Sequence, residues 1–220
     1  MASVLVTGGN RGIGLELCRQ LSARGDRVVA ACRAPSPELE ALGVRIERDI
    51  DVTDPAAAAA LSKRLAGTRL DVLVHNAGVL SHESLDQLDV AAIRRQLEVN
   101  AIGPLALTAA LRPLLGAGSK LVLVTSRMGS IADNGSGGYY GYRMSKAALN
   151  AAGVSLARDL APAGIAVLMV HPGMVRTGMT GGVIGIEPSE AVRGILARVD
   201  ALTLATTGKF LHANGEELPW

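Results

Sequence analysis

The sequence predicts an α/β fold: a mostly parallel sheet of seven strands, doubly wound, with helices on both faces. Short apolar runs recur along the chain, each followed by glycine or polar residues and then by a helical stretch. The runs are nearly continuous rather than alternating, as in parallel strands that are covered on both faces. Strand–helix alternation over 220 residues indicates right-handed crossovers, which place helices on both sides of the sheet.

The expected elements follow in order along the chain. Asp54 and Pro55 illustrate how a helix start is recognised, because Asp caps a helix and Pro suits its first turn. No repeat or linker divides the chain, so we expect one NAD(P)-binding domain over residues 1–220 that also holds the catalytic residues. The apolar runs assigned to strands are Val4–Thr7, Val28–Ala31, Val44–Ile46, Val72–Val74, Leu121–Thr125 and Ile165–Val170. Helices are expected over Ile13–Ala23, after Asp54-Pro55, over about Asp89–Leu115 with a break near Gly103-Pro104, over Tyr142–Leu160 and over about Ser189–Leu202.

Composition excludes several classes of protein. Hydrophobic residues make up 49% of the chain and charged residues 19%, which excludes an intrinsically disordered chain. The 22 cations and 20 anions form no long run of one sign, so we expect no nucleic-acid partner. No His-Glu-x2-His or Cys-x2-Cys spacing is present, so we expect no metal site.

The N-terminal stretch and the apolar runs bear on localisation. The chain has no basic segment followed by an apolar stretch of signal-peptide type. It also has no run of about 18 apolar residues that would cross a bilayer. We therefore expect a cytoplasmic protein with no membrane partner.

A glycine-rich turn follows the first apolar run: Thr7-Gly8-Gly9-Asn10-Arg11-Gly12-Ile13-Gly14. Such a turn lets the backbone approach a pyrophosphate, and the following helix N-terminus favours negative charge. The spacing Gly-x3-Gly-x-Gly differs from the common dinucleotide fingerprint of the Rossmann fold. The alternative is a tight strand–helix turn that binds no ligand.

The end of the second apolar run bears on the choice of nucleotide. An acidic residue there would accept hydrogen bonds from a ribose 2′-OH and select NAD. This chain has Cys32 and Arg33 instead, and Arg11 lies in the glycine turn. Two guanidinium groups can hold a 2′-phosphate through charge-assisted bonds. The sequence therefore favours NADP(H) over NAD(H), the alternative being two solvated surface arginines.

Tyr142 and Lys146 are spaced to share one face of a helix. A nearby ammonium lowers the pKa of a tyrosine, which can then protonate an alkoxide or deprotonate an alcohol. Tyr-x3-Lys is common by chance, but Ser126 ends a strand sixteen residues earlier. That strand end faces the ligand crevice, where a hydroxyl can polarise a substrate carbonyl.

Asn100 is the fourth candidate. Position 104 is proline, which has no N–H for the carbonyl of residue 100. The helix should therefore kink, leaving a carbonyl that can hold a water linked to Lys146. The alternative is a helix interruption that serves packing alone.

Together these residues resemble the short-chain dehydrogenase/reductase family, in the family's order and over nearly the whole chain. The resemblance implies a catalytic tetrad of Asn100, Ser126, Tyr142 and Lys146. It also implies that Asp51 bonds the adenine amino group and that Val52 packs on the ring. The implied cofactor-binding residues are Gly8, Asn10, Arg11, Gly12, Ile13, Gly14, Arg33, Asp51, Val52, Asn76, Ala77, Gly78, Tyr142, Lys146, Pro172, Gly173, Val175 and Thr177.

Ser126–Asn134, Gly141–Lys146 and the ending Leu218-Pro219-Trp220 resemble the C-factor/sniffer branch, which is related to carbonyl reductases. The resemblance implies an NADPH-dependent oxidoreductase that transfers a hydride between nicotinamide and a ketone or aldehyde, or the corresponding alcohol. A glycine-rich stretch between Thr177 and Pro188 is expected to form a short lid. The alternative is an NAD(P)-binding regulatory or signalling protein with little turnover. The sequence leaves open whether the protein forms a homodimer or a higher homo-oligomer.

Overall fold

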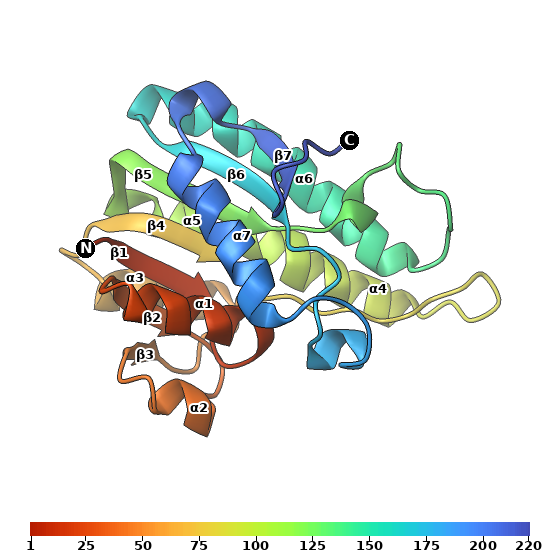
Figure 1. The fold of residues 1–220 in the computed structure, drawn as a ribbon, viewed down its shortest axis with the longest axis horizontal. Coiled ribbons are helices and arrows are strands. Elements are labelled where there is room, and N and C mark those ends of the chain that lie inside the picture. The colour runs from red at the N-terminus through yellow and green to blue at the C-terminus, as the bar shows by residue number, and fades with distance from the viewer.

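The computed structural model describes residues 1–220 and contains one sheet of seven parallel strands (Figure 1). Their spatial order is β3-β2-β1-β4-β5-β6-β7. The expected doubly wound α/β fold is confirmed. The strands are β1 Ser3–Thr7, β2 Arg27–Ala31, β3 Arg45–Glu47, β4 Leu70–His75, β5 Leu115–Val124, β6 Ala166–His171 and β7 Lys209–His212.

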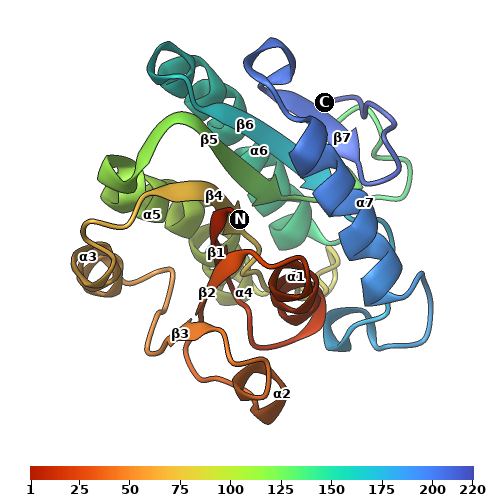
Figure 2. The same cartoon turned by 60° about the vertical axis from the view of Figure 1, so that its left-hand side comes forward.

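Helices cover both faces of the sheet. Helices α1 and α7 lie side by side on one face, and α3, α5 and α6 lie on the other (Figure 2). The short α2 lies beyond the edge strand β3. The helices are α1 Gly12–Ala23, α2 Pro37–Glu40, α3 Pro55–Arg64, α4 Val90–Leu97, α5 Gly103–Leu111, α6 Tyr140–Leu160 and α7 Pro188–Ala201.

Two apolar cores explain the continuous apolar runs. Successive residues of a strand point to opposite faces of the sheet. Leu5 belongs to the core under α3, α5 and α6, whereas Val4 and Val6 belong to the core under α1 and α7. Because both faces are buried, apolar residues dominate both sets of positions.

The helix starts follow local chemistry. The Asp54 side chain accepts a hydrogen bond of 2.8 Å from the Ala56 N–H, and Pro55 occupies the first turn. This confirms the start expected from Asp54-Pro55. Asp89 caps α4 in the same way, accepting from the Ala92 N–H at 3.0 Å.

The structure differs from the expected elements in three places. The expected helix up to Leu115 ends at Leu111, and β5 begins at Leu115, before the apolar run at Leu121. The first part of β5 is rich in small residues and its register with β4 shifts. Helix α2 and strand β7, each of four residues, were not among the assigned runs.

The expected helix break near Gly103-Pro104 is present as a π-helical turn over Glu98–Ile102. The Gly103 N–H donates to the Glu98 carbonyl, which is the wider i→i+5 pattern. A proline at position 104 offers no donor to the carbonyl of Asn100. The π-helical turn adds one residue to the helical path between α4 and α5, and so accommodates the hydrogen bond that Pro104 cannot donate.

None of the helices combines the length and the apolar character that a membrane span requires. No cluster of three or more His, Cys, Asp or Glu side chains is placed to hold a metal ion.

Candidate active site

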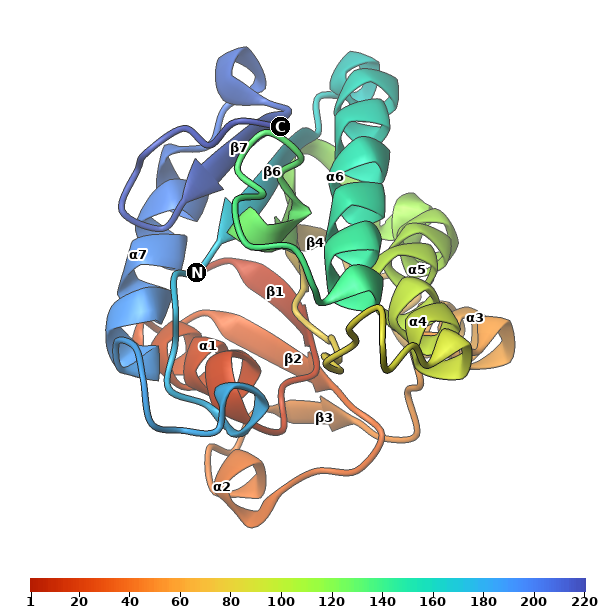
Figure 3. The ribbon, with the colours of Figure 1, turned by 90° about the vertical axis from the view of Figure 1, so that its right-hand side faces the viewer.

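A cavity of about 360 Å³ opens at the carboxyl ends of β1, β2, β4, β5 and β6. Figure 3 faces this edge of the molecule, with the start of α6 and the segments that follow β4 and β6 around it. The strand order reverses between β1 and β4. A reversal of this kind opens a crevice in which doubly wound proteins bind ligands.

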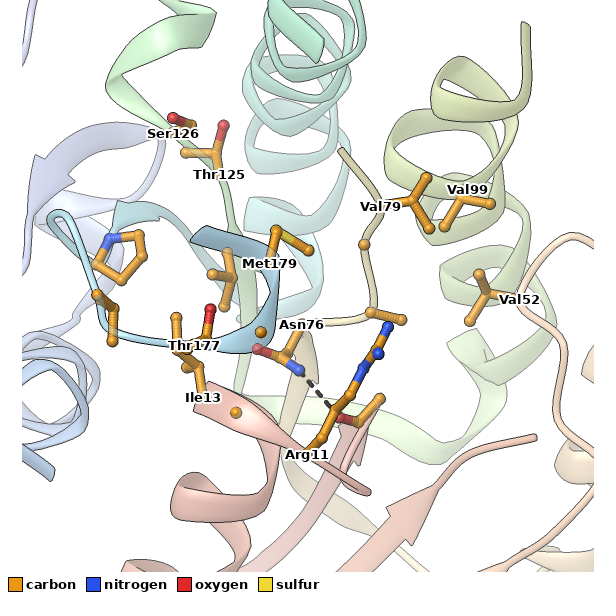
Figure 4. Close-up of a pocket in the computed structure, with 18 of the residues that line it drawn as sticks. Arg11, Ile13, Val52, Asn76, Val79, Val99, Thr125, Ser126, Thr177 and Met179 are labelled. Atoms are coloured by element: carbon orange, nitrogen blue, oxygen red, sulfur yellow. Dashed lines mark hydrogen bonds between the residues drawn. The ribbon is translucent and has the colours of Figure 1, made fainter. Parts of the chain in front are cut away.

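The glycine turn forms the floor of the cavity. Gly8 and Gly12 have φ of +67° and +55°, which favours glycine. A Cβ on Gly8 would lie 2.9 Å from the Ala77 Cα, so the turn after β1 touches the segment after β4. The Asn76 amide fastens this contact by donating to the carbonyls of Thr7 at 3.0 Å and Gly8 at 3.2 Å (Figure 4).

The start of α1 fits an anionic group. Arg11 occupies the cap position, and no side chain accepts from the first N–H groups of the helix. These donors carry the positive end of the helix dipole. The turn can therefore receive a pyrophosphate through its backbone.

Three guanidinium groups line one end of the cavity: Arg11, Arg33 and Arg95. All three side chains are exposed, and none forms an ion pair. Sequence patterns pointed to Arg11 and Arg33. Arg95 was missed, because its distance from the glycine turn in the chain hides their proximity in the fold.

Asp51 is the carboxylate that lines the same end. Its Oδ1 accepts from the Thr53 N–H at 2.9 Å and from the Thr53 hydroxyl at 2.7 Å. These bonds lower the pKa of Asp51, and nearby Arg33 and Arg95 act in the same direction. The carboxylate is thus kept ionised as an acceptor.

Ser126, Tyr142 and Lys146 meet at the opposite end of the cavity. Ser126 follows β5, and its position beside Thr125 is visible in Figure 4. Tyr142 and Lys146 lie on the buried face of α6. The Lys146 ammonium lies 5.8 Å from the centre of the Tyr142 ring.

The electrostatics of this group are dominated by burial. Burial lowers the pKa of Lys146 to about 8, and its Nζ donates to the Val124 carbonyl at 2.9 Å. Burial raises the pKa of Tyr142, and the Ser126 side chain acts in the opposite direction. Tyr142 is therefore neutral near pH 7 and carries a proton that it can donate. The lowering of its pKa by Lys146 stays a prediction.

Two expected site residues lie behind the cavity wall. The Asn100 side chain is fully buried, accepts from the Val79 N–H at 2.8 Å, and donates to the Val79 carbonyl at 2.8 Å and to the Ser145 hydroxyl at 3.0 Å. A Cβ on Gly14 would lie 2.1 Å from the Gly8 carbonyl oxygen. Both residues therefore support the residues that line the cavity.

The other expected residues line the cavity itself. They are Gly8, Asn10, Arg11, Gly12, Ile13, Arg33, Asp51, Val52, Asn76, Ala77, Gly78, Ser126, Tyr142, Lys146, Pro172, Gly173, Val175 and Thr177. The lining residues that sequence reasoning did not assign to the site are Cys32, Ile50, Val79, Arg95, Val99, Val124, Thr125, His171, Gly178, Met179 and Thr180. Several of them are adjacent in the sequence to expected residues, and this adjacency is the signal that could have identified them.

His171 ends β6 and lines the cavity. Burial lowers its pKa to about 3, so the ring is neutral. Its Nδ1 is buried and has no hydrogen-bond partner. This nitrogen is therefore an unsatisfied polar atom of the protein interior.

The fold and the cavity define a class of protein: a dinucleotide-binding α/β protein with polar groups gathered at its topological switch point. Comparison with known proteins identifies the family. The profile described as short chain dehydrogenase matches residues 2–184. The chain belongs to the short-chain dehydrogenase/reductase family and is an oxidoreductase of that family.

Individual relatives agree with this placement. The chain is 44% identical over the full length of both chains to 1-hydroxy-2-glutathionyl-2-methyl-3-butene dehydrogenase of a Rhodococcus species. It is also 44% identical to C-signal of Myxococcus xanthus, over 69% of this chain and 93% of that protein. NADPH-bound carbonyl reductase from chicken fatty liver has a TM-score of 0.90 at 31% identity, covering 100% of this chain and 99% of that one.

Proposed function

We propose that this protein is a carbonyl reductase that uses NADP(H), with residues 1–220 forming one domain for cofactor binding and catalysis. It transfers a hydride between nicotinamide and a ketone or aldehyde, or the corresponding alcohol. The observation that carries the proposal is the placement of Ser126, Tyr142 and Lys146 in one cavity with the glycine turn and the arginines.

The residues present fit a phosphate-bearing nicotinamide cofactor. The uncapped start of α1 and the unpaired Arg11, Arg33 and Arg95 suit its phosphates. Asp51 offers an acceptor to the adenine amino group. When bound, the cofactor supplies or accepts the hydride. The likeness to a reductase crystallised with NADPH supports this choice.

The residues of the chain handle the proton and the substrate oxygen. Tyr142 donates its proton to the oxygen as hydride arrives, and takes it back in the reverse direction. Ser126 donates a hydrogen bond to the same oxygen and orients the carbonyl. Lys146 places a positive charge beside Tyr142, which favours the tyrosinate that results. Asn100 lies outside the cavity and supports its wall through hydrogen bonds to Val79 and Ser145.

Replacing Tyr142→Phe tests the mechanism. General acid–base catalysis contributes roughly a hundredfold to ten-thousandfold, so kcat should fall by at least about a hundredfold. The variant keeps the ring and should bind NADPH with a Kd like that of the wild type. Turnover retained near the wild-type rate would overturn the role of Tyr142.

The substrate panel should include alcohols with a bulky thioether substituent, since one relative is named for a glutathionyl alcohol. Oxidation of such alcohols and reduction of simple ketones and aldehydes can then be compared in one assay. The preferred class is the one with the larger kcat/KM.

The likeness to C-signal favours a second candidate, a regulatory or signalling protein that binds NAD(P) with little turnover. Both candidates predict cofactor binding. Saturable NADPH binding without turnover on the whole carbonyl and alcohol panel would favour the second. Substrate-dependent NADPH oxidation would favour the enzyme.

A further inference from the structure

Glu83 carries a buried carboxylate that the proposed mechanism does not use. The residue is 1% exposed and forms no ion pair with a Lys or Arg side chain. A carboxylate without a cation is costly to bury unless hydrogen bonds compensate. Here the partners are neutral donors from three different segments.

The donors to Glu83 come from α4, from α6 and from its own segment. One carboxylate oxygen accepts from the Gln96 amide at 2.7 Å and from the Ser81 hydroxyl. The other accepts from the Gly141 N–H at 3.2 Å. The Gln96 carbonyl oxygen in turn accepts from the Ser81 N–H at 3.1 Å. Glu83 and Gln96 thus share a closed hydrogen-bonded arrangement.

Gly141 belongs to the first turn of α6, immediately before Tyr142. Its N–H is one of the donors that a helix leaves free at its start, where a negative charge is favourable. A Cβ on Gly141 would lie 2.2 Å from the Gln96 Nε2, so the contact leaves no room for a side chain. Helices α4 and α6 are therefore held together next to Tyr142.

The main chain of Glu83 holds the residue that precedes the helix. Its carbonyl accepts from the Tyr139 N–H at 2.9 Å. Tyr139 has φ of +51°, an uncommon conformation for a residue with a side chain. Glu83 thus contacts both Tyr139, where the chain turns into α6, and Gly141, where the helix begins.

The same segment reaches the cofactor end of the cavity. Asn76 ties its start to the glycine turn, and Asn100 holds Val79 from behind. A series of hydrogen-bonded residues therefore runs from the floor of the cavity to α6, which carries Tyr142, and Glu83 is its last member. Because Ser126 follows β5 and is not part of α6, a displacement of Glu83 would move the start of α6 relative to Ser126.

We propose that Glu83, together with Gln96, is a positioning unit that fixes the first turn of α6 and thereby sets the Tyr142 hydroxyl against Ser126. The proposal rests on the proposed function for its kinetic consequence. Glu83 contacts neither the cavity nor the reacting atoms.

Replacing Glu83→Gln tests this unit, because it keeps the size of the side chain but replaces one acceptor oxygen with a donor. That donor must face the Gly141 N–H or the Gln96 amide. A small displacement of a catalytic group costs up to about a hundredfold in rate, so kcat should fall about tenfold to a hundredfold. The Kd for NADPH should stay within about twofold.

The exchange variant Glu83→Gln/Gln96→Glu separates positioning from loss of the fold. It restores a donor–acceptor pair between the two side chains and leaves the amide oxygen at position 83 free to accept from Gly141. Most of the lost kcat should return. The matched control is Glu47→Gln on β3, another buried carboxylate, which pairs with Arg45 and Arg64. It should lower stability and leave kcat unchanged.

A readout without substrate separates this proposal from the proposed function. The pKa of Tyr142 can be followed by ultraviolet titration in a Tyr139→Phe/Tyr140→Phe background, which leaves Tyr142 as the only tyrosine. Glu83→Gln should shift that pKa, and the exchange variant should restore it. An unchanged titration together with unchanged kcat would overturn the positioning role. A shifted titration in a protein that turns over no substrate would sink only the proposed function.

Discussion

Arg11, Arg33 and Arg95 give the cavity a cationic end that no protein carboxylate neutralises through an ion pair. Asp51, the carboxylate at this end, balances only part of the three positive charges, so a further anion is favourable there. A 2′-phosphate would supply that anion. These arginine side chains should therefore decide the preference between NADP(H) and NAD(H).

Replacing Arg33→Ala should weaken NADPH binding about tenfold to a hundredfold, since a hydrogen bond to a charged group contributes roughly 1.5–3 kcal/mol. The Kd for NADH should change little, because NADH has no 2′-phosphate. Fluorescence titration with both cofactors measures the ratio. Equal losses for NADPH and NADH would remove Arg33 from the phosphate site. Arg27→Ala, at the opposite end of β2, is the control and should affect neither.

His75 gives a second residue-scale prediction. Its Nε2 lies 2.8 Å from the Thr108 hydroxyl, and burial lowers its pKa from 6.5 to about 3. The unfolded chain therefore binds more protons than the folded one between these values. The free energy of unfolding should fall as pH drops from 6.5 towards 3, by on the order of a few kcal/mol.

Denaturant unfolding at several pH values measures this dependence. In His75→Gln the acid-induced loss of stability should be smaller than in the wild type, with His171 contributing the remainder in the same direction. A pH dependence identical to that of the wild type would show that His75 does not titrate in this window.

At the scale of elements, α6 and the turn after β5 approach closely. A Cβ on Gly129 would lie 2.7 Å from the Lys146 carbonyl carbon and 2.9 Å from its Cβ. Backbone against backbone leaves no flexible group that can move aside. The distance between Ser126 and the helix of Tyr142 is thus set by a residue without a side chain.

Gly129→Ala should separate these two elements. We expect a loss of about 1–3 kcal/mol in the free energy of unfolding and a drop in kcat larger than the change in cofactor Kd. Gly135→Ala lies later in the same loop, where a Cβ meets nothing within 4 Å. That control should leave stability and kcat unchanged. An active, fully stable Gly129→Ala would show that the turn relaxes.

How far the sequence predicts the molecule also depends on scale. Most strands and helices followed from apolar runs and caps, because those signals are local, but α2 and β7 did not. Arg95 and Glu83 escaped notice, because each acts on a residue distant in the chain. Asn100 was recognised, but its side chain proved to hold Val79 and Ser145 from behind. No local pattern specifies such contacts.

For the whole molecule, a cofactor that binds only the folded state should raise its apparent stability by mass action. At a concentration a hundredfold above Kd the gain is about 2.7 kcal/mol. We expect a larger rise in Tm with NADPH than with NADH in parallel thermal-shift titrations. A larger rise with NADH would reverse the cofactor preference. No shift with either would contradict the proposed cofactor site.

The reversal of strand order at β1 also has a consequence for biosynthesis. Strand β1 pairs with β4 through Val4 and Val72, and the cavity walls run from Gly8 to Thr180. Pairings this distant form late, because a long loop must close first. A nascent chain thus holds its glycine turn long before the opposing wall leaves the ribosome. Cofactor capture would therefore mark the near-completion of folding rather than assist its start.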